Sequence, residues 1–433
     1  MKLSGFQTRG LIEGFYGTPW RMQDRRLVLE KLAARGINAY FYGPKDDPLH
    51  RERWRALYPP DGGMLPEMIA LAEANGMSFC YLLAPGLDIR YTSEADLAAI
   101  ERKYAQVYRF GVRRFGLLLD DLEQASCYPA DAAAYPTQAE AHAALANRVF
   151  RMLTALDPQN TLVVCPTQYW GSPDTPYLRT LSRSLPAAVD FFYTGSRICS
   201  AELTAADAEA FQTATGRQPL FWDNYPVNDA EMVDELHLAP YAGRAPELAG
   251  KCRGIVLNPM EFAHLSLIPL LTAADFLNDP TSYQPEKSFD RAVCETVGAE
   301  LLLAVRRLAE FCWKSCLTHS GFHYRYDAPT GRNASFEAAY EAGTDVLCAY
   351  VRESGRLFQR LDASAPAAFR KECQRWLDTA AAFCTAAENL LAAGDDTALR
   401  SYLYRPEDVM KPEAARILAL SARETPQKRK DNR

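Results

Sequence analysis

Eight short apolar runs recur along the first two-thirds of the chain, and most of them are followed by a segment with helical periodicity. The runs begin at Gly10, Asn38, Ser78, Phe115, Thr161, Val189, Pro219 and Gly254. Each is a continuous stretch of aliphatic, β-branched or aromatic residues without a polar alternation, which is typical of strands buried on both faces. The segments with helical periodicity are Arg25–Arg35, Pro66–Asn75, Glu94–Phe110, Gln138–Leu156 and Ala201–Thr213. Strands and helices are therefore expected to alternate.

This alternation predicts a (β/α)8 TIM barrel over residues 1–277. A doubly wound parallel sheet is the main alternative. The turn after the first run, however, carries Gly10, Gly14 and Gly17, whose spacing does not fit the GxGxxG pattern of dinucleotide-binding folds. The barrel is the favoured fold.

The pattern changes after Leu277. Residues 278–288 are rich in turn-forming residues and are expected to be a linker. From there, apolar residues at helical spacing and Ala-rich segments predict an α-helical bundle over residues 289–424. Residues 425–433 are expected to be a frayed tail, and the helical region is also a candidate surface for homodimer formation.

Composition narrows the function classes. The chain has 433 residues, with 48 basic and 54 acidic side chains and a net charge of −6, and it carries no basic block, so nucleic acid is not an expected partner. No apolar stretch is long enough for a membrane span, and the N-terminus lacks a signal-peptide pattern. The 11 cysteines are scattered singly, which favours reduced thiols and a cytoplasmic protein.

Polar side chains follow the predicted strands, where a barrel places its catalytic groups. Asp120 and Asp121 come after the fourth strand, Asn224 after the seventh and Asn258 after the eighth. Aromatic residues accompany them. Carboxylates and amides provide directional hydrogen bonds for hydroxyl groups, and aromatic rings provide flat faces, so a neutral sugar is the expected ligand.

Two pairs of adjacent aspartates compete for an acid–base role. Asp46 and Asp47 are followed by cationic residues, which favours a salt-bridged turn. Asp120 and Asp121 follow an apolar run with no cation close behind, so they are the favoured catalytic pair, and one of them is expected to be held protonated near neutral pH. Capping of a following helix is the alternative for this pair.

Adjacency in sequence suggests a mechanism. Two neighbouring residues approach a sugar from nearly the same side, whereas an ordinary retaining glycosidase places acid and nucleophile on opposite sides of the bond. The pair therefore favours substrate assistance, in which a 2-acetamido oxygen of the sugar attacks C1.

Six blocks give a specific resemblance. They are GLIEGFYGTPW from Gly10, YFYGPKDDPLHRERW from Tyr40, GLLLDDLE from Gly116, CPTQYWG from Cys165, WDNYPVND from Trp222 and LNPMEFAH from Leu257. In content and order they resemble family 84 glycoside hydrolases, the family of the O-GlcNAcases and related β-N-acetylglucosaminidases.

The resemblance implies roles for individual residues. Asp120 would orient and polarise the 2-acetamido group, and Asp121 would act as general acid and then as general base. Asn224 would hold the geometry on the acetamide side. The expected ligands of the sugar hydroxyls are Gly14, Lys45, Asp229 and Asn258, and the expected walls around the acetyl methyl are Cys165, Tyr169 and Trp222.

The expected function is thus an exo-acting, retaining β-N-acetylglucosaminidase that removes O-linked GlcNAc from Ser or Thr of proteins. Two alternatives stay open, namely cleavage of GlcNAc-containing glycans such as hyaluronan or chitin fragments, and GlcNAc binding without catalysis. No cofactor is expected. Cys312, Cys316, His319 and His323 have a spacing that could suggest zinc, but Gly321 interrupts their helix and no metal site is predicted.

Overall fold

The computed structural model describes residues 5–122, 128–312, 338–339 and 341–394. These residues form two compact units. The first contains residues up to Tyr225 together with Arg244–Glu261 and Ala274–Tyr283, and the second contains Pro226–Gly243, Phe262–Ala273 and the chain from Gln284 onward.

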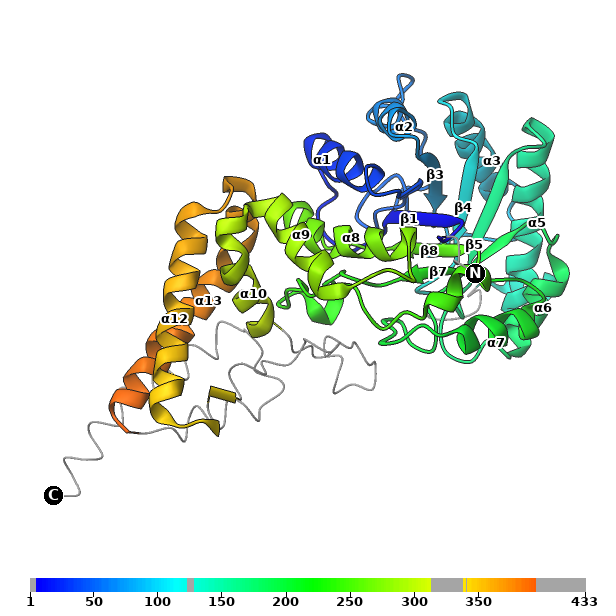
Figure 1. The fold of residues 1–433 in the computed structure, drawn as a ribbon. Helices are drawn as coiled ribbons and strands as arrows, with labels where there is room; N and C mark the ends of the chain where they lie inside the picture. The colour runs from blue at the N-terminus through cyan, green and yellow to red at the C-terminus, as the bar shows by residue number, and fades with distance from the viewer. Residues whose placement is uncertain (1–4, 123–127, 313–337, 340, 395–433) are drawn as a thin grey trace. The chain divides into compact units, whose positions relative to one another are not determined.

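The first unit is a closed barrel of eight strands in sequential order, as predicted (Figure 1). Each strand runs parallel to both neighbours, and β1 closes the barrel against β8 with Thr8 opposite Gly254. The strands are β1 (Thr8–Glu13), β2 (Ala39–Tyr42), β3 (Ser78–Leu83), β4 (Arg114–Leu118), β5 (Thr161–Cys165), β6 (Asp190–Tyr193), β7 (Leu220–Asp223) and β8 (Gly254–Leu257). Every predicted strand is present.

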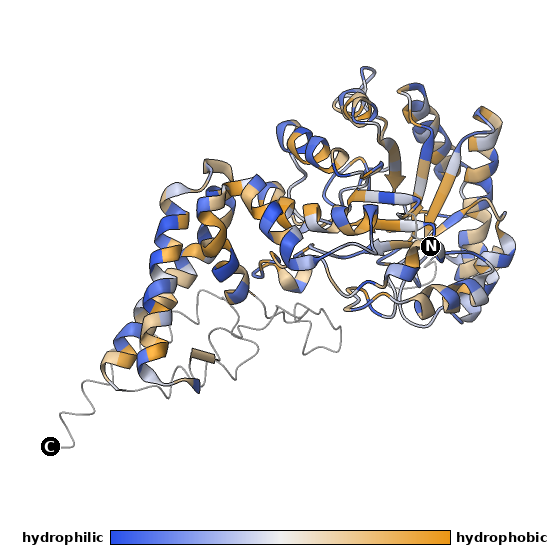
Figure 2. Ribbon diagram, viewed as in Figure 1, coloured by the Kyte–Doolittle hydropathy of each residue, from blue (hydrophilic) through white to orange (hydrophobic). Residues whose placement is uncertain are grey.

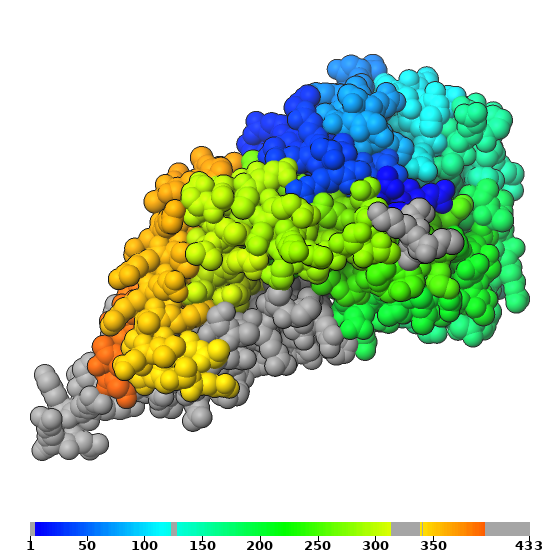
Figure 3. Space-filling model, viewed as in Figure 1, coloured from blue at the N-terminus to red at the C-terminus, as the bar shows by residue number. Residues whose placement is uncertain are grey.

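Helices cover the outside of the barrel strands. They are α1 (Met22–Ala33), α2 (Leu65–Ala74), α3 (Glu94–Arg109), α4 (Pro129–Ala134), α5 (Gln138–Leu156), α6 (Pro176–Ser184) and α7 (Ala205–Thr215). The 3₁₀ helix η2 (Pro246–Gly250) precedes β8. In Figure 2 orange predominates in the strands while the outer helices are a mixture of blue and orange, and in Figure 3 side chains fill the gaps that separate the ribbons of α1 and α2 in Figure 1.

Side-chain caps set several helix boundaries. Thr137 and Glu140 form a reciprocal capping box at the start of α5. Thr204 and Asp207 do the same for α7, which is why this helix begins later than the Ala201 predicted from periodicity. The pattern did not predict α6, a short helix that is capped by the Thr175 hydroxyl.

The interior of the barrel is packed with side chains from all eight strands. The residues are Ile12, Ala39, Phe41, Cys80, Leu82, Ala84, Leu118, Val163, Cys165, Phe192, Leu220, Trp222 and Val256, with Tyr169 packed against them. The barrel is therefore a filled core that presents loops at its two ends.

The second unit is helical. It contains the start of α8 (Ala263–Asn278), then α9 (Pro285–Val297), α10 (Leu302–Phe311), α12 (Thr344–Ser364) and α13 (Ala367–Ala392), with the 3₁₀ helices η1 (Ala230–Met232) and η3 (Ala299–Leu301). Phe311 packs edge-on against Phe358 and Phe383, which ties three of these helices together. A predicted helical region therefore does follow the barrel.

The compact units do not follow the predicted cut at residue 277. Residues 226–243 and 262–273 group with the helical unit because side chains of α13 bond to their backbone. Glu372 accepts hydrogen bonds from the backbone N–H groups of His264 and Leu265 near the start of α8, and Trp376 Nε1 donates to the carbonyl of Asp234 at 2.8 Å. The predicted linker at 278–288 overlaps α9, which begins at Pro285 in the position that favours proline. Parts of the predicted bundle and the tail lie outside the described residues.

Candidate functional site

Asp120 and Asp121 lie just beyond the carboxyl end of β4, as the predicted site requires. The Lys45 ammonium, on the loop after β2, contacts the Asp120 carboxylate and lies 3.6 Å from Asp121 Oδ2. Lys45 and Asp120 are almost fully buried, whereas Asp121 is about one-third exposed, with 32% of its side chain accessible. The cation therefore joins two carboxylates of which Asp121 is the one that reaches the surface.

Asp121 is held by hydroxyl groups from two other strand ends. Tyr16, after β1, donates to Oδ2 at 2.9 Å, and Tyr169, after β5, donates to Oδ1 at 3.0 Å. The backbone of Asp121 has φ = 54°, in the left-handed region that non-glycine residues seldom adopt. Such strained residues persist where surrounding contacts fix them, and they concentrate at functional sites.

The expectation that one carboxyl group of the pair is protonated does not hold for Asp121 in this structure. Burial alone would raise the pKa of Asp121, but the Lys45 ammonium and the hydroxyls of Tyr16 and Tyr169 outweigh it and lower the pKa. Burial alone would likewise lower the pKa of Lys45, but the two carboxylates raise it, so the ammonium stays charged. The sequence pattern could not reveal a cation supplied by a different strand.

Among the described residues, one carboxylate oxygen of Asp120 has no hydrogen-bond donor. Lys45 bonds to Oδ2, while Oδ1 is buried and meets no hydrogen-bond donor among the described residues. A buried carboxylate oxygen without a donor is costly. The site is therefore prepared for a ligand that brings an N–H or O–H group to this atom.

A second set of predicted residues lies at the ends of β7 and β8. Asn224 Oδ1 accepts from Trp222 Nε1 at 3.0 Å and from Asn258 Nδ2 at 2.9 Å. The Asn224 amide nitrogen donates to the carbonyl of Ile198 at 2.9 Å, so both polar atoms of the Asn224 side chain have a protein partner. Asn258 Oδ1 is buried and has no donor among the described residues. Asn258 thus also offers an acceptor to a ligand.

Trp222 contacts both groups of predicted site residues, the carboxylates with Lys45 on one side and Asn224 with Asn258 on the other. The Lys45 ammonium lies 5.8 Å from the centre of its ring. A Cβ on Gly14 would stand 2.6 Å from a carbon of the same ring, so only glycine fits there without a shift. Cys165 and Trp222 belong to the same buried cluster, against which Tyr169 packs. Burial raises the pKa of the Cys165 thiol well above its usual range, which favours the uncharged thiol.

Asp229 is the one predicted site residue outside the first unit. It lies in the second unit, just before η1, and its predicted contact with sugar stays a prediction.

The rival pair, Asp46 and Asp47, forms a turn stabilised by hydrogen bonds. Asp46 accepts from the backbone N–H of Gly17 at 2.8 Å. Asp47 accepts from the Tyr42 hydroxyl at 2.8 Å and from the backbone N–H of Leu49 at 2.9 Å. This pair is structural, although its partners are hydrogen-bond donors where cations were expected.

Glu13 ends β1 and is completely buried. Its carboxylate accepts from the Arg25 guanidinium at 2.6 and 2.9 Å, from the Tyr40 hydroxyl at 2.5 Å and from the Trp20 backbone N–H at 3.1 Å. These bonds anchor both ends of the loop that carries Gly14 and Tyr16. Glu13 therefore supports the site without facing it.

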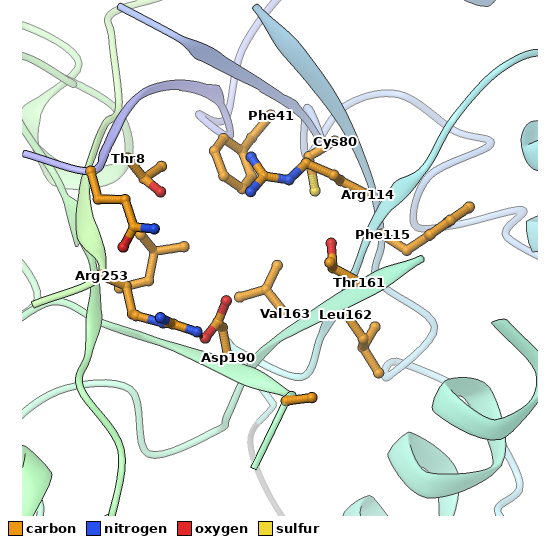
Figure 4. A pocket seen from close by; sticks show the side chains of 13 residues that line it. Thr8, Phe41, Cys80, Arg114, Phe115, Thr161, Leu162, Val163, Asp190 and Arg253 are labelled. Atoms are coloured by element: carbon orange, nitrogen blue, oxygen red, sulfur yellow. Dashed lines mark hydrogen bonds and ion pairs between the residues drawn. The ribbon is translucent and has the colours of Figure 1, made fainter. Parts of the chain in front are cut away.

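The opposite end of the barrel has a cavity of about 310 Å³ at the amino ends of the strands (Figure 4). Its charged residues already have partners. Arg253 pairs with Asp190 at 3.1 Å, and Arg114 donates to the Ser78 hydroxyl at 2.7 Å. This end of a barrel ordinarily serves stability, and the Asp190 carboxylate in this cavity is paired with Arg253.

Two residues of the site were not singled out by the sequence. Tyr16 lies in the GLIEGFYGTPW motif, where the resemblance assigns it no role. Arg51 is one of the cationic residues that follow Asp46 and Asp47. In the structure Arg51 Nη1 donates to the Tyr16 hydroxyl at 2.8 Å. Nothing in the spacing of these residues signals a contact that joins three different strand ends.

Among the described residues, no group of three or more His, Cys, Asp or Glu side chains could hold a metal ion. Cys312 is the buried residue that directly follows α10, and the other three residues of the Cys–His pattern lie outside the described ranges. The nine cysteines described are all free thiols. Within the same ranges, no helix has the length and apolar character that crossing a membrane requires.

A parallel barrel with acidic and amide side chains at the carboxyl ends of its strands is the architecture of barrel enzymes. The model of the β-N-acetylglucosaminidase family matches residues 9–310, and the chain belongs to this family of glycoside hydrolases.

Individual relatives agree with this assignment. The protein O-GlcNAcases of Rattus norvegicus and Mus musculus are each 34% identical over 257 residues, covering 58% of this chain and 28% of theirs. The chain thus corresponds to little more than a quarter of each curated relative. An O-GlcNAc hydrolase mutant from Thermobaculum terrenum has a similar structure, with a TM-score of 0.81, 31% identity and coverage of 96% of this chain and 94% of its own. The structure of CpGH84B matches with a TM-score of 0.75 and 26% identity, over 96% of this chain and 73% of its own.

Proposed function

We propose that the chain is a retaining exo-β-N-acetylglucosaminidase that uses the 2-acetamido group of its substrate as the nucleophile and removes O-linked GlcNAc from Ser or Thr of proteins. The observation that carries the proposal is the buried Oδ1 of Asp120, which meets no donor among the described residues. An acetamide N–H is a donor of the right kind for this atom. A glucoside with a hydroxyl at C2 has no acetamide oxygen to attack C1.

The first step forms one bond and breaks another. Asp120 accepts the acetamide N–H and makes the carbonyl oxygen more nucleophilic. That oxygen bonds to C1 as the bond from C1 to the leaving oxygen breaks, and Asp121 gives its proton to the leaving oxygen. The products are an oxazolinium ion, whose N–H stays hydrogen-bonded to the Asp120 carboxylate, and the free hydroxyl of the acceptor.

In the second step Asp121 is ionised and accepts a proton from water, which attacks C1 and opens the oxazoline with overall retention. The lowered pKa of Asp121 suits this step. For the first step Asp121 must carry a proton, so we infer that sugar hydroxyls compete for the Lys45 ammonium and weaken its hold on Asp121.

The remaining predicted residues have roles consistent with their contacts. Lys45 and Asn258 are buried polar groups beside the carboxylates and Asn224, and they would bind sugar hydroxyls. Trp222, Tyr169 and Cys165 would enclose the acetyl methyl. Gly14 would let the sugar approach its backbone, and Asp229 would provide a further acceptor.

A direct test compares 4-nitrophenyl β-GlcNAc with the matching β-glucoside. We expect hydrolysis of the first with retention, essentially no hydrolysis of the second, and inhibition by a stable thiazoline analogue of the oxazoline. A covalent adduct on Asp or Glu, trapped with a 2-fluoro sugar, would contradict substrate assistance.

The acceptor is tested separately with a GlcNAc-modified Ser peptide, chitin fragments and hyaluronan fragments. Faster release from the peptide supports the protein substrate. Preference for either glycan would favour a glycan hydrolase, and binding of GlcNAc without turnover of any substrate would indicate a non-catalytic protein.

A further inference from the structure

The Tyr16 hydroxyl contacts both a cation, the Arg51 guanidinium, and the Asp121 carboxylate. Arg51 Nη1 lies 2.8 Å from the Tyr16 hydroxyl oxygen, and that oxygen lies 2.9 Å from Asp121 Oδ2. The Arg51 guanidinium also lies 5.3 Å from the centre of the Tyr16 ring.

The chemistry of the three groups fixes the direction of both hydrogen bonds. A guanidinium has donors only, so the Tyr16 oxygen must accept from Arg51. The single hydroxyl hydrogen of Tyr16 is then free to donate to Asp121. Burial raises the pKa of Tyr16 to about 12, so this hydrogen remains on the hydroxyl at working pH. Arg51 therefore sets which way the Tyr16 hydroxyl points.

Arg51 is carried on a segment that is anchored on both sides. His50, just before it, is completely buried, and its Nδ1 lies 2.8 Å from the carbonyl oxygen of Leu82. Burial lowers the pKa of His50 to about 3, so the ring is neutral. Trp54 is also fully buried and donates from Nε1 to Asp88 at 2.7 Å. The backbone that carries Arg51 is thus fixed on either side by buried residues.

The other groups that face Asp121 act on it directly. Lys45 approaches Oδ2 from the loop after β2, and Tyr169 donates to Oδ1 from the end of β5. Asp120 precedes Asp121 in the chain and takes the closer contact of Lys45. Tyr16 is the one direct contact of Asp121, among those described here, that is itself directed by another cation.

We propose that Arg51 is a positioning residue for the general acid–base Asp121, acting through Tyr16: it directs the Tyr16 hydroxyl so that this group holds the Asp121 carboxylate in one orientation for both proton transfers. The inference rests on the proposed role of Asp121. Its consequence is that losing Arg51 disturbs proton transfer and leaves the attack by the acetamide group unchanged.

The test measures kcat/KM against pH for Arg51→Met, Tyr16→Phe and the double variant, with an aryl β-GlcNAc whose phenol is a poor leaving group. The limb at high pH reports deprotonation of the general acid in the free enzyme. Arg51 and Tyr16 favour the ionised form of Asp121, so removing either should raise its pKa and move this limb to higher pH by about 0.5–1 unit.

The orientation of the Asp121 carboxylate is tested by a second measurement, the dependence of kcat on the leaving group. With the poor leaving group, kcat of Arg51→Met should fall roughly 10-fold, the effect of a modest misplacement of a reacting group. With an activated phenol it should fall less than about 3-fold, because such a phenol hardly needs a proton. In the Tyr16→Phe background, Arg51→Met should add less than about 2-fold. Arg51→Lys, which retains a cationic donor, should recover part of the loss.

Arg53→Met is the matched control, since Arg53 is exposed on the same segment and its side chain has no polar contact with the described residues; its kinetics should equal those of the parent. The proposal is overturned if Arg51→Met has the same high-pH limb and the same kcat as the parent. It is also overturned if Arg51→Met lowers kcat by the same factor in the Tyr16→Phe background as it does alone. Should Arg51→Met fail to fold, Arg51→Lys and Tyr16→Phe still decide, because parent-like profiles in both overturn it. If Asp121→Asn itself shows no dependence on the leaving group, the proposed role of Asp121 fails, which is a separate outcome.

Discussion

The two ends of the barrel both carry charged side chains, yet these side chains are paired in different ways. At the amino ends of the strands, Arg253 pairs with Asp190 and Arg114 bonds to Ser78. At the carboxyl ends, the single buried ammonium of Lys45 contacts Asp120 and lies 3.6 Å from Asp121, and Asp120 Oδ1 meets no donor among the described residues. The comparison indicates that two adjacent carboxylates sharing one cation distinguish the carboxyl end of this barrel more clearly than a cavity does.

The largest expected effect separates Asp120 from Asp121. Asp121→Asn should lower the rate with poor leaving groups by about 10²–10⁴-fold and retain much more activity with activated phenols, because only the former need a proton. Asp120→Asn should slow both kinds of substrate by similar factors, because it acts on the nucleophile. Rates across a series of aryl β-GlcNAc substrates provide the measurement.

Asp190→Asn, at the amino end of the barrel, is the control for these two variants. Its rates should match those of the parent. If Asp120→Asn has the steep dependence on leaving group and Asp121→Asn does not, the two roles are reversed.

The second expected effect concerns stability. Glu13 and Arg25 are completely buried, so Arg25→Met should reduce the free energy of unfolding by about 3–5 kcal/mol by leaving the Glu13 carboxylate unpaired. Arg253→Met, which breaks the partly exposed pair with Asp190, should cost no more than about 1 kcal/mol. Denaturant titration of both variants measures the difference, and equal losses would contradict the distinction between the two ends.

The smallest expected effect is at Gly14. A methyl group there would stand 2.6 Å from the Trp222 ring, so Gly14→Ala should displace that wall and lower kcat/KM for aryl β-GlcNAc about 10-fold. Gly250→Ala is the matched control, since a Cβ on Gly250 meets nothing within 4 Å. Parent-like kinetics in Gly14→Ala would show that the pocket tolerates movement of Trp222.

The sequence predicted the barrel because each strand is a local apolar run, as in SFCYLL of β3, and such runs need no knowledge of distant residues. It also placed Asp120, Asn224 and Asn258 at strand ends, since topology alone brings those ends together. It did not predict the lowered pKa of Asp121, because the Lys45 ammonium that lowers it comes from a residue 76 positions away along the chain. The contacts of Tyr16 with Arg51 and with Asp121 were not predicted for the same reason, since no periodicity encodes contacts between three loops.

The left-handed backbone of Asp121 bears on how this protein could be used to identify its natural substrates. Asparagine tolerates that conformation nearly as well as aspartate, whereas alanine has no polar side chain to bond there and a branched residue would be strained. Asp121→Asn is therefore the inactivating change that best preserves the loop. Immobilised on a resin, this variant would serve as a bait that retains GlcNAc-bearing proteins from a cell extract, and free GlcNAc would release them for identification.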